Sequence, residues 1–441
     1  MMQATFRRNT ELSLLIFALI VGCGALAIVA ATRNVDRLPE AAPVMIILAI
    51  CYVVAHIVMR KFAPQADALI LPLVAVLNGL GVTAVYRLDS EGLGPAQVTW
   101  TAVGILFFIG TLVLVRDYRT LARFKYLFGF AGIGLLLLPV FVGTEINGAR
   151  LWIQFAGFSF QPGELAKLGL VIFFAAYLAE RKELLAIASR RLFGFHVPDL
   201  KHFGPLLVMW GLSLAVMFYE KDLGSSLLFF SIFLVMLYIA TARIVYMVFG
   251  GLLFAVGATV GYTVFSHVQV RVQVWLDTFN PQTINDESYQ LAQSLFALAT
   301  GGLFGTGLIQ GLPDLIPAAH TDFLFSVVGE ELGLMGTSAV LLGFILLLSR
   351  GLRVAVGART DFGQLLGAGL TAILGLQTFI ILAGVTRLLP LTGITLPFMS
   401  YGGSSLLSNF ILVALLARIS HQNAAEPAPA ETAEILIGGR R

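Results

Sequence analysis

Twelve apolar runs, most of them close to 20 residues long, constrain this chain more than any other feature of its sequence. They lie near 11–31, 41–58, 67–86, 96–115, 126–142, 164–180, 204–219, 223–242, 245–267, 323–349, 365–386 and 404–418. A helix needs about 20 residues to cross roughly 30 Å of hydrocarbon. Charged residues make up only 12% of the 441, whereas soluble proteins contain about 25%. The sequence therefore predicts an all-α polytopic membrane protein with about 12 transmembrane helices.

The basic residues predict how these spans are oriented. Segments on one side of the predicted bundle contain twenty lysines and arginines, and segments on the other side contain seven. The positive-inside rule places the more basic side in the cytoplasm. Both termini are then cytoplasmic, and the longest loop, 268–322, is extracytoplasmic and lies between spans 9 and 10. We expect residues 421–441, which are rich in Ala, Pro and Glu, to form a disordered cytoplasmic tail.

The sequence argues against several classes of site. Cys23 and Cys51 both lie inside apolar runs, so a disulfide framework is not expected. The six histidines show no spacing typical of a metal site, so we assign no residues as metal ligands. The basic residues are those of ordinary cytoplasmic loops, so nucleic-acid binding is not expected either.

The residues His320, Thr321 and Asp322 end the long loop just before an apolar run. One interpretation is a helix N-cap, because Thr or Asp at this position accepts hydrogen bonds from free backbone N–H groups. The other is a carboxylate held at the outer membrane face as a general base. Composition alone favours the cap, and the two interpretations are compatible.

Glu330 and Glu331 follow eight and nine residues into that run, about 12 Å along a helix. Ionisable groups at such depth are costly unless they are paired or hydrated. They are therefore either functional or a buried pair with a basic partner. The stretch Tyr289–Thr300 in the preceding loop is mildly amphipathic, which suits a helix on the membrane surface.

Glu164 and Lys167 lie just after Gln161-Pro162-Gly163, a typical helix start. Their spacing puts both on one helix face, where a simple ion pair is the ordinary outcome. A lysine inside an apolar span could instead bind an anionic group such as a phosphate. Arg150 and Trp152 could contact the same ligand or anchor the chain at the interface.

Two further segments could bind an anion. Arg271 begins the long outer loop, and its guanidinium suits phosphate, although it could also extend to the interface from a buried stem. The segment from Ser400 to Ser405, which includes Ser404, leads into the last span. Its small residues favour close helix packing, and its backbone N–H groups could also hold an anion.

Six segments together resemble the SEDS family of bacterial cell-wall synthesis, which contains the RodA, FtsW and SpoVE proteins. They are NGARLWI, FQPGELAKL, EKDLGSSL, YQLAQSLFALATGGLFGTGL, PAAHTDFLFSVVGEELGLMG and LLPLTGITLPFMSYGGSSLL. The resemblance covers about 100–420 and is greatest to the actinobacterial RodA branch. It implies a ten-helix core preceded by two extra helices. We therefore divide the chain into N-terminal spans, 1–95, and a catalytic membrane core, 96–420.

The resemblance implies a peptidoglycan glycosyltransferase of the bacterial plasma membrane with an extracytoplasmic active site. Such an enzyme polymerises lipid II into β-1,4-linked glycan strands during cell elongation, with inversion and with undecaprenyl diphosphate as leaving group. Asp322 matches the family's essential acid, which we take as the general base. Candidate substrate-binding residues are Glu164, Lys167, Arg150, Trp152, Arg271, His320, Thr321, Glu330 and Ser404.

The implied partners are lipid II, a class B penicillin-binding protein with transpeptidase activity, and membrane lipids. A divalent cation, Mg or Mn, could share the charge of the diphosphate, although the sequence contains no dedicated ligand cluster. Three alternatives stay open at this point: a transporter that flips lipid-linked precursor, a division paralogue of the FtsW type, and a scaffold that only recruits other enzymes.

Overall fold

A helix coincides with each of the twelve predicted apolar runs. The computed structural model describes residues 2–33, 38–146, 149–155, 158–186, 190–192, 195–197 and 204–425. The long helices are α1 (Met2–Arg33), α2 (Leu38–Phe62), α3 (Ile70–Leu88), α4 (Leu93–Leu114), α6 (Lys125–Val142), α7 (Gly163–Ala186), α8 (Gly204–Tyr219), α9 (Leu223–Thr241), α10 (Ile244–Val264), α13 (Leu324–Val356), α14 (Asp361–Val385) and α15 (Gly403–Ala425).

Ten of these helices are long and apolar enough to cross a membrane. The other two are α7, which contains Glu164, Lys167 and Glu180, and α8, which is an apolar helix of 16 residues. The prediction of a mostly helical, multi-pass membrane protein is confirmed. It stays a prediction that all twelve helices cross the membrane, and so does the orientation of the bundle in it.

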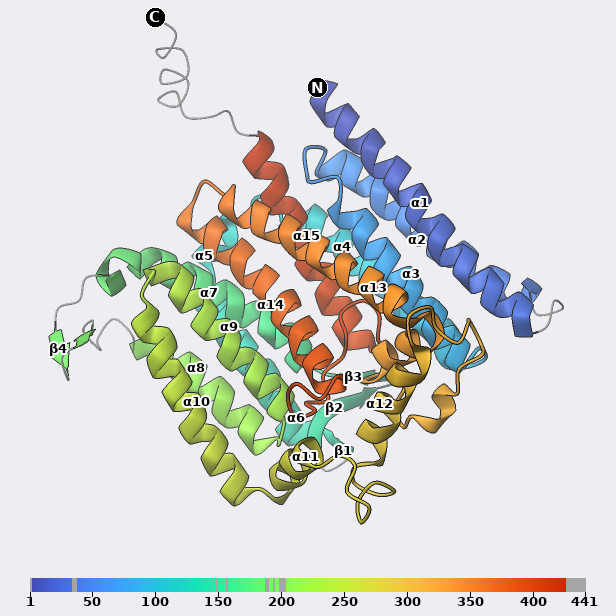
Figure 1. Cartoon of the computed structure of the whole chain (residues 1–441). Coiled ribbons are helices and arrows are strands. Elements are labelled where there is room, and N and C mark those ends of the chain that lie inside the picture. The colour runs from blue at the N-terminus through green and yellow to red at the C-terminus, as the bar shows by residue number, and fades with distance from the viewer. Residues whose placement is uncertain are drawn as a thin grey trace, which may run out of the picture.

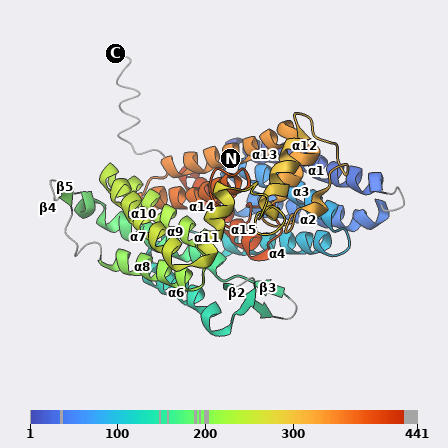
Figure 2. The same ribbon diagram turned by 60° about the horizontal axis from the view of Figure 1, so that its bottom comes forward.

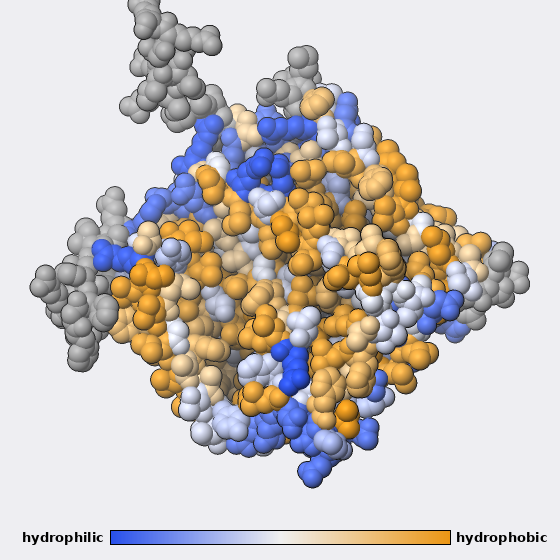
Figure 3. Space-filling view, in the orientation of Figure 1, coloured by the Kyte–Doolittle hydropathy of each residue, from blue (hydrophilic) through white to orange (hydrophobic). Residues whose placement is uncertain are grey.

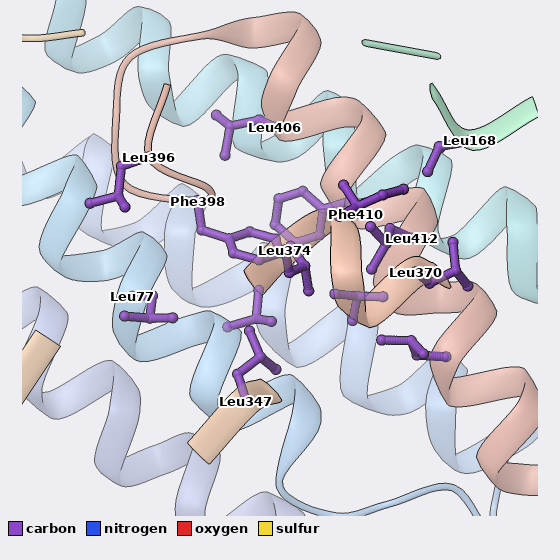
Figure 4. Close-up of a cluster of buried hydrophobic side chains, with 14 of the residues drawn as sticks. Leu77, Leu168, Leu347, Leu370, Leu374, Leu396, Phe398, Leu406, Phe410 and Leu412 are labelled. Atoms are coloured by element: carbon purple, nitrogen blue, oxygen red, sulfur yellow. The ribbon is translucent and has the colours of Figure 1, made fainter. Parts of the chain in front are cut away.

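The bundle is built around its last helix. In α15, 94% of the apolar window is buried, compared with 11% in α10, so α15 lies at the centre and α10 at the edge (Figure 1). Figure 4 shows the packed interior next to α15, where Leu and Phe side chains from distant parts of the chain meet. Phe398, from the loop before α15, contacts Phe410 of α15 with the ring centroids 5.7 Å apart.

At one edge of the bundle, α1 packs along α3, and α2 packs against α4 and α1 (Figure 1). Gly22 of α1 and Gly79 of α3 let the two backbones approach closely: a Cβ added to either would lie 3.1 Å from the other's Cα. Arg8 and Glu11 form a buried ion pair in α1, and Glu11 also contacts His56 of α2 at 2.7 Å. The two helices are therefore integral to the bundle.

The beginning of α1 and the end of α15 lie at the same end of the bundle. The Arg7 guanidinium donates to the carbonyl of Gln65, and the Gln65 N–H donates to Nδ1 of His421. The predicted disordered tail is wrong for 421–425, which continue α15. Side chains hold this extension, because Gln422 and Asn423 donate to backbone carbonyls of the neighbouring segments. The rest of the tail lies outside the described residues.

The opposite end carries α11 (Ser266–Leu276), α12 (Tyr289–Gly301) and the 3-10 helix η3 (Pro313–Leu315), together with a small sheet (Figure 2). The sheet consists of β1 (Thr144–Ile146), β2 (Ala149–Phe155) and β3 (Phe158–Phe160), all antiparallel. The sequence analysis did not predict it. The remaining elements are α5 (Thr120–Arg123) and a hairpin of β4 (Arg190–Leu192) and β5 (Phe195–Val197).

A kink at Gly333 divides α13 into two pieces, which corrects the continuous span predicted at 323–349. Gly333 has a positive φ of 65°, and a Cβ there would lie only 2.3 Å from the backbone N of Gly305. The N–H groups of Leu334 and Met335, just after the kink, donate to the carbonyls at 302 and 303. Glu330 and Glu331 therefore lie in a short first piece of α13, next to the end of α12.

Candidate functional site

The loop at 386–402, between α14 and α15, connects the parts of the candidate site. Nη1 of Arg271, on α11, donates to the carbonyls of Leu391 and Thr392, each at 3.2 Å. Tyr401, near the end of the loop, donates its backbone N–H to the carbonyl of His320 at 2.8 Å. Through these contacts, the loop brings Arg271 and the segment that carries Asp322 together.

Asp322 and Arg271 approach the same point of this loop. Gly393 has a φ of 76°, and a Cβ placed on it would lie 3.7 Å from Oδ2 of Asp322 and 4.0 Å from Nη2 of Arg271. Both side chains are half-buried. Burial raises the pKa of Asp322 to about 6, while the Arg271 charge and the neighbouring Thr321 hydroxyl act in the opposite direction. The carboxylate is therefore a stronger base than an exposed aspartate, yet it is mostly ionised at pH 7.

The N-cap interpretation of Thr321 and Asp322 is wrong. The N-cap residue of α13 is Phe323, and no side chain caps that helix end. The Thr321 hydroxyl donates instead to the carbonyl of Ala318 at 3.2 Å. The Asp322 carboxylate is therefore not used to terminate the helix.

A second cluster lies at the start of α7. The Lys167 ammonium contacts Oε2 of Glu164 at 2.5 Å and donates to Oε1 of Gln377 at 3.0 Å. Ser408 of α15 donates to the same Glu164 oxygen at 2.9 Å. Gln377 in turn donates to the carbonyl of Thr395, in the 386–402 loop. The predicted ion pair of Glu164 and Lys167 is present, and it is linked to the loop that Asp322 and Arg271 approach.

Asp222 connects the two clusters electrostatically, and the sequence analysis did not single it out. It caps α9 by accepting from the N–H of Ser225 at 2.9 Å. Burial raises the pKa of Asp222, the Arg271 charge lowers it, and the Glu164 charge raises it. Glu220, two residues earlier, is buried, and burial raises its pKa to about 8. In the sequence, Asp222 could have been found because EKDLGSSL places two acids, Glu220 and Asp222, just before an apolar run.

Ser404 and His320 hold segments in place around these clusters. The Ser404 hydroxyl accepts from the N–H of Gln161 at 2.8 Å, which joins the start of α15 to the segment before α7. The His320 ring packs edge-on against Tyr401, with centroids 5.9 Å apart. Burial lowers the pKa of His320 and so favours the neutral ring, while the Asp89 charge acts in the opposite direction.

Arg150 and Trp152 are not brought into either cluster by the contacts described for them. Both lie on β2, where Trp152 pairs with Thr144 of β1. Arg150 is 57% exposed and lies 3.8 Å from Glu145. A role of Arg150 or Trp152 in binding the ligand of Lys167 stays a prediction from the sequence.

Glu330 and Glu331 form a separate group. Oε1 of Glu331 contacts Nε of Arg87 at 2.9 Å, and Arg87 also donates to the carbonyl of Gly311. Oε1 of Glu330 accepts from the N–H of Leu312 at 3.0 Å. Together they fasten the segment before η3 to the first piece of α13. The interpretation as a buried pair with a basic partner fits this geometry for Glu331.

Two further observations bear on what the site could hold. Among the described residues, no group of three or more His, Cys, Asp or Glu side chains is placed to hold a metal ion. An apolar cavity of about 380 Å³ lies beside the kink of α13; its lining includes Leu298, Phe325, Leu334 and Leu341. Phe325 follows Asp322 by three residues in the chain, although Asp322 itself does not line the cavity.

The comparisons with known proteins agree with one another. The family model FTSW_RODA_SPOVE, described as "Cell cycle protein", matches residues 59–425. Peptidoglycan glycosyltransferase RodA of Mycobacterium leprae is 46% identical over 94% of this chain and 90% of that protein. A probable peptidoglycan glycosyltransferase FtsW of a Geobacter species is 36% identical over 80% of this chain and 96% of that protein.

A solved structure is also similar to this chain. It belongs to a study of how a peptidoglycan synthase complex coordinates polymerization and crosslinking. The sequences are 26% identical, the TM-score is 0.67, and the match covers 82% of this chain and 99% of that one.

Proposed function

The chain belongs to the FtsW/RodA/SpoVE family and is a peptidoglycan glycosyltransferase, and we propose that it polymerises lipid II with Asp322 as general base. The observation that carries the proposal is the approach of the Asp322 carboxylate and the Arg271 guanidinium to one point at Gly393. A base with a raised pKa beside a fixed cation suits a reaction that removes a proton and releases an anion.

In the proposed reaction, the 4-hydroxyl of the acceptor GlcNAc attacks C1 of the donor MurNAc. Asp322 takes the proton of that hydroxyl. The bond between C1 and the diphosphate oxygen breaks, and undecaprenyl diphosphate leaves with the bonding electrons. Attack from the opposite side converts the α-linked donor into a β-1,4-linked product.

Arg271 and Lys167 are the cations that would stabilise the departing diphosphate. Among the described residues, Arg271 donates only from Nη1, to two carbonyls, so other N–H groups of its five remain for a ligand. Lys167 is already paired with Glu164, which holds its ammonium in place. It would therefore act on the diphosphate through its positive charge. A shared Mg or Mn ion stays a prediction from the sequence, and no step above depends on it.

The donor or acceptor lipid also needs an apolar site, and the cavity beside the α13 kink supports one. We propose that it receives the first isoprenoid units of a lipid substrate. The proposed side of the reaction is extracytoplasmic, in line with the positive-inside rule. Greater identity to RodA than to FtsW supports a role in elongation, and the similar synthase complex supports a class B penicillin-binding protein as partner.

The transporter alternative is weakened by one observation. Its proton or substrate path would use Glu330, Glu331 and Lys167, but Glu331 is bound to Arg87 and Lys167 to Glu164. These contacts fit structural and electrostatic roles.

The test is glycan synthesis by the purified protein from fluorescent lipid II, alone and with its transpeptidase partner. Asp322→Asn keeps the size of the side chain but removes the base, and we expect polymer to fall by at least 100-fold. Asp286→Asn, which makes the same change at an exposed aspartate of the same loop, is the matched control and should polymerise within about twofold of wild type. Polymer at the wild-type rate in Asp322→Asn would refute the proposed base, and lipid translocation without polymer in the wild type would favour the transporter.

A further inference from the structure

A second cavity, lined in part by charged side chains, lies at the opposite end of the bundle from Asp322. Its volume is about 380 Å³, and it is bounded by the start of α1, the segment before α3, and the ends of α13 and α15. The charged side chains that line it are Arg7, Asp67, Arg350 and Arg353. Three arginines and one aspartate give this cavity, the basic cavity, a net charge of +2.

The hydrogen bonds leave most of this positive charge free. Asp67 is fully used inside the protein: Oδ2 contacts the Arg350 guanidinium, and Oδ1 accepts from the N–H of Leu69. Arg7 donates from Nη1 to the carbonyl of Gln65. Among the described residues, Arg353 makes no hydrogen bond or ion pair, so its five N–H groups are all available to a ligand.

Apolar side chains stand next to these arginines. Phe6 precedes Arg7 and is 74% exposed, while Leu352 and Val356 flank Arg353 and are 52% and 82% exposed. Figure 3 shows hydrophilic side chains gathered at the end of the molecule where α1 begins, beside the apolar surface of the spans. The basic cavity therefore combines arginines that can bind an anion with a neighbouring apolar surface where acyl chains would lie.

We propose that the basic cavity binds the phosphate head group of an anionic phospholipid. Basic pockets between transmembrane helices on the cytoplasmic side are suited to such head groups, and each Lys or Arg near the membrane surface contributes about 1 kcal/mol. A phosphodiester with its acyl chains matches both halves of the site, whereas a soluble anion would leave Phe6 and Val356 uncovered. This site is separate from the reaction centre.

The test compares binding of short-chain phosphatidylglycerol and phosphatidylcholine to the purified full-length chain in detergent. Binding is followed by native mass spectrometry and by the shift in thermal unfolding midpoint. We expect phosphatidylglycerol to bind the wild type more tightly. Arg7→Gln with Arg353→Gln should weaken this binding at least tenfold, because each arginine accounts for roughly fivefold in affinity. Both side chains are exposed, so the double variant should fold.

The matched control is Arg116→Gln with Arg123→Gln, which removes two exposed arginines from the same predicted side but outside the cavity. It should change binding by less than twofold. Equal weakening in both double variants would overturn the proposal in favour of a diffuse basic surface. Equal binding of the two lipids to the wild type would also overturn it. The same stabilisation by millimolar inorganic phosphate would replace the lipid with a soluble anion and overturn the lipid assignment.

Discussion

Asp322 experiences two opposing effects at the scale of the single residue: burial disfavours its charged form, and the Arg271 charge favours it. Burial is the larger of the two, so the pKa is raised to about 6. A general base acts only when ionised. Its pKa should therefore be visible in the pH dependence of polymerisation.

We expect the polymerisation rate to fall about tenfold per pH unit below pH 6, because protonated Asp322 cannot accept the acceptor's proton. Arg271 lowers this pKa, so Arg271→Gln should move the midpoint of the acidic limb to higher pH, besides slowing the reaction. The measurement is single-turnover glycan synthesis between pH 5 and 8. Arg150→Gln should leave the midpoint in place, because Arg150 is exposed and near Glu145. A midpoint that stays or moves down in Arg271→Gln would contradict the proposed geometry.

Lys167 poses a different question, because its removal affects stability as well as charge. Lys167→Ala leaves the Glu164 carboxylate without its cation, and breaking such a buried pair costs about 3 kcal/mol or more. Adding Glu164→Gln removes that unpaired charge and should recover most of the lost thermal stability. If Lys167 stabilises the diphosphate, the double variant should stay at least tenfold slower than wild type. Recovery of both stability and polymerisation would show that the pair is only structural.

At the scale of elements, the sequence predicted the helices well and their interruptions poorly. Apolar runs of about 20 residues have one stable form in a bilayer, since a helix pairs its own backbone groups. The kink at Gly333 depends on carbonyls at 302 and 303, in another segment. The strands β1 and β3 have only three residues each, too few for an alternating pattern. The seven residues of β2, ARLWIQF, do alternate in polarity, and the sequence analysis overlooked this signal.

In the candidate site too, local contacts could be predicted from the sequence and contacts between distant segments could not. Glu164 and Lys167 are three residues apart, so their pairing followed from helix geometry alone. The partner of Glu331 is Arg87, 244 residues away in the chain, and sequence spacing could not find it. Asp322 and Arg271 were found through family motifs, whereas their meeting point at Gly393 is a property of the folded loop.

The position of α11 can be tested directly. This helix carries Arg271, and Arg387 holds its C-terminal end. Arg387 donates to the carbonyls of Trp275 and Leu276, in the last turn of α11, and Trp275 donates back to the carbonyl of Arg387. Arg387 has a φ of 61°, which asparagine also tolerates. Arg387→Asn therefore removes the guanidinium without adding backbone strain.

We expect Arg387→Asn to speed hydrogen exchange across 266–276 and to slow polymerisation roughly tenfold, since a hydrogen bond from a charged group contributes about 1.5–3 kcal/mol. In Arg387→Asn, the midpoint of the acidic limb of the polymerisation rate should shift less than in Arg271→Gln, because Arg271 keeps its charge. Asp286→Asn, at an exposed residue of the same outer loop, is the control. Unchanged exchange with unchanged rate would mean that α11 is held by other contacts.

At the scale of the whole molecule, the two ends of the bundle have different chemistry. One end carries Asp322, Arg271 and the loop at 386–402, and the other carries the basic cavity with the start of α1 and the end of α15. The proposed reaction needs the first end outside the cytoplasm, where glycan is assembled. Orientation is therefore the property on which the other proposals depend.

We expect a cysteine at Asp314, an exposed residue of η3, to react with a membrane-impermeant maleimide in right-side-out vesicles. A cysteine at Arg123, exposed in α5, should react only after permeabilisation, because an odd number of predicted spans separates the two positions. Both variants need Cys23→Ser and Cys51→Ser, since those thiols are only partly buried. The opposite labelling pattern would put Asp322, eight residues after Asp314, on the cytoplasmic side, and a general base for extracytoplasmic glycan synthesis could not lie there.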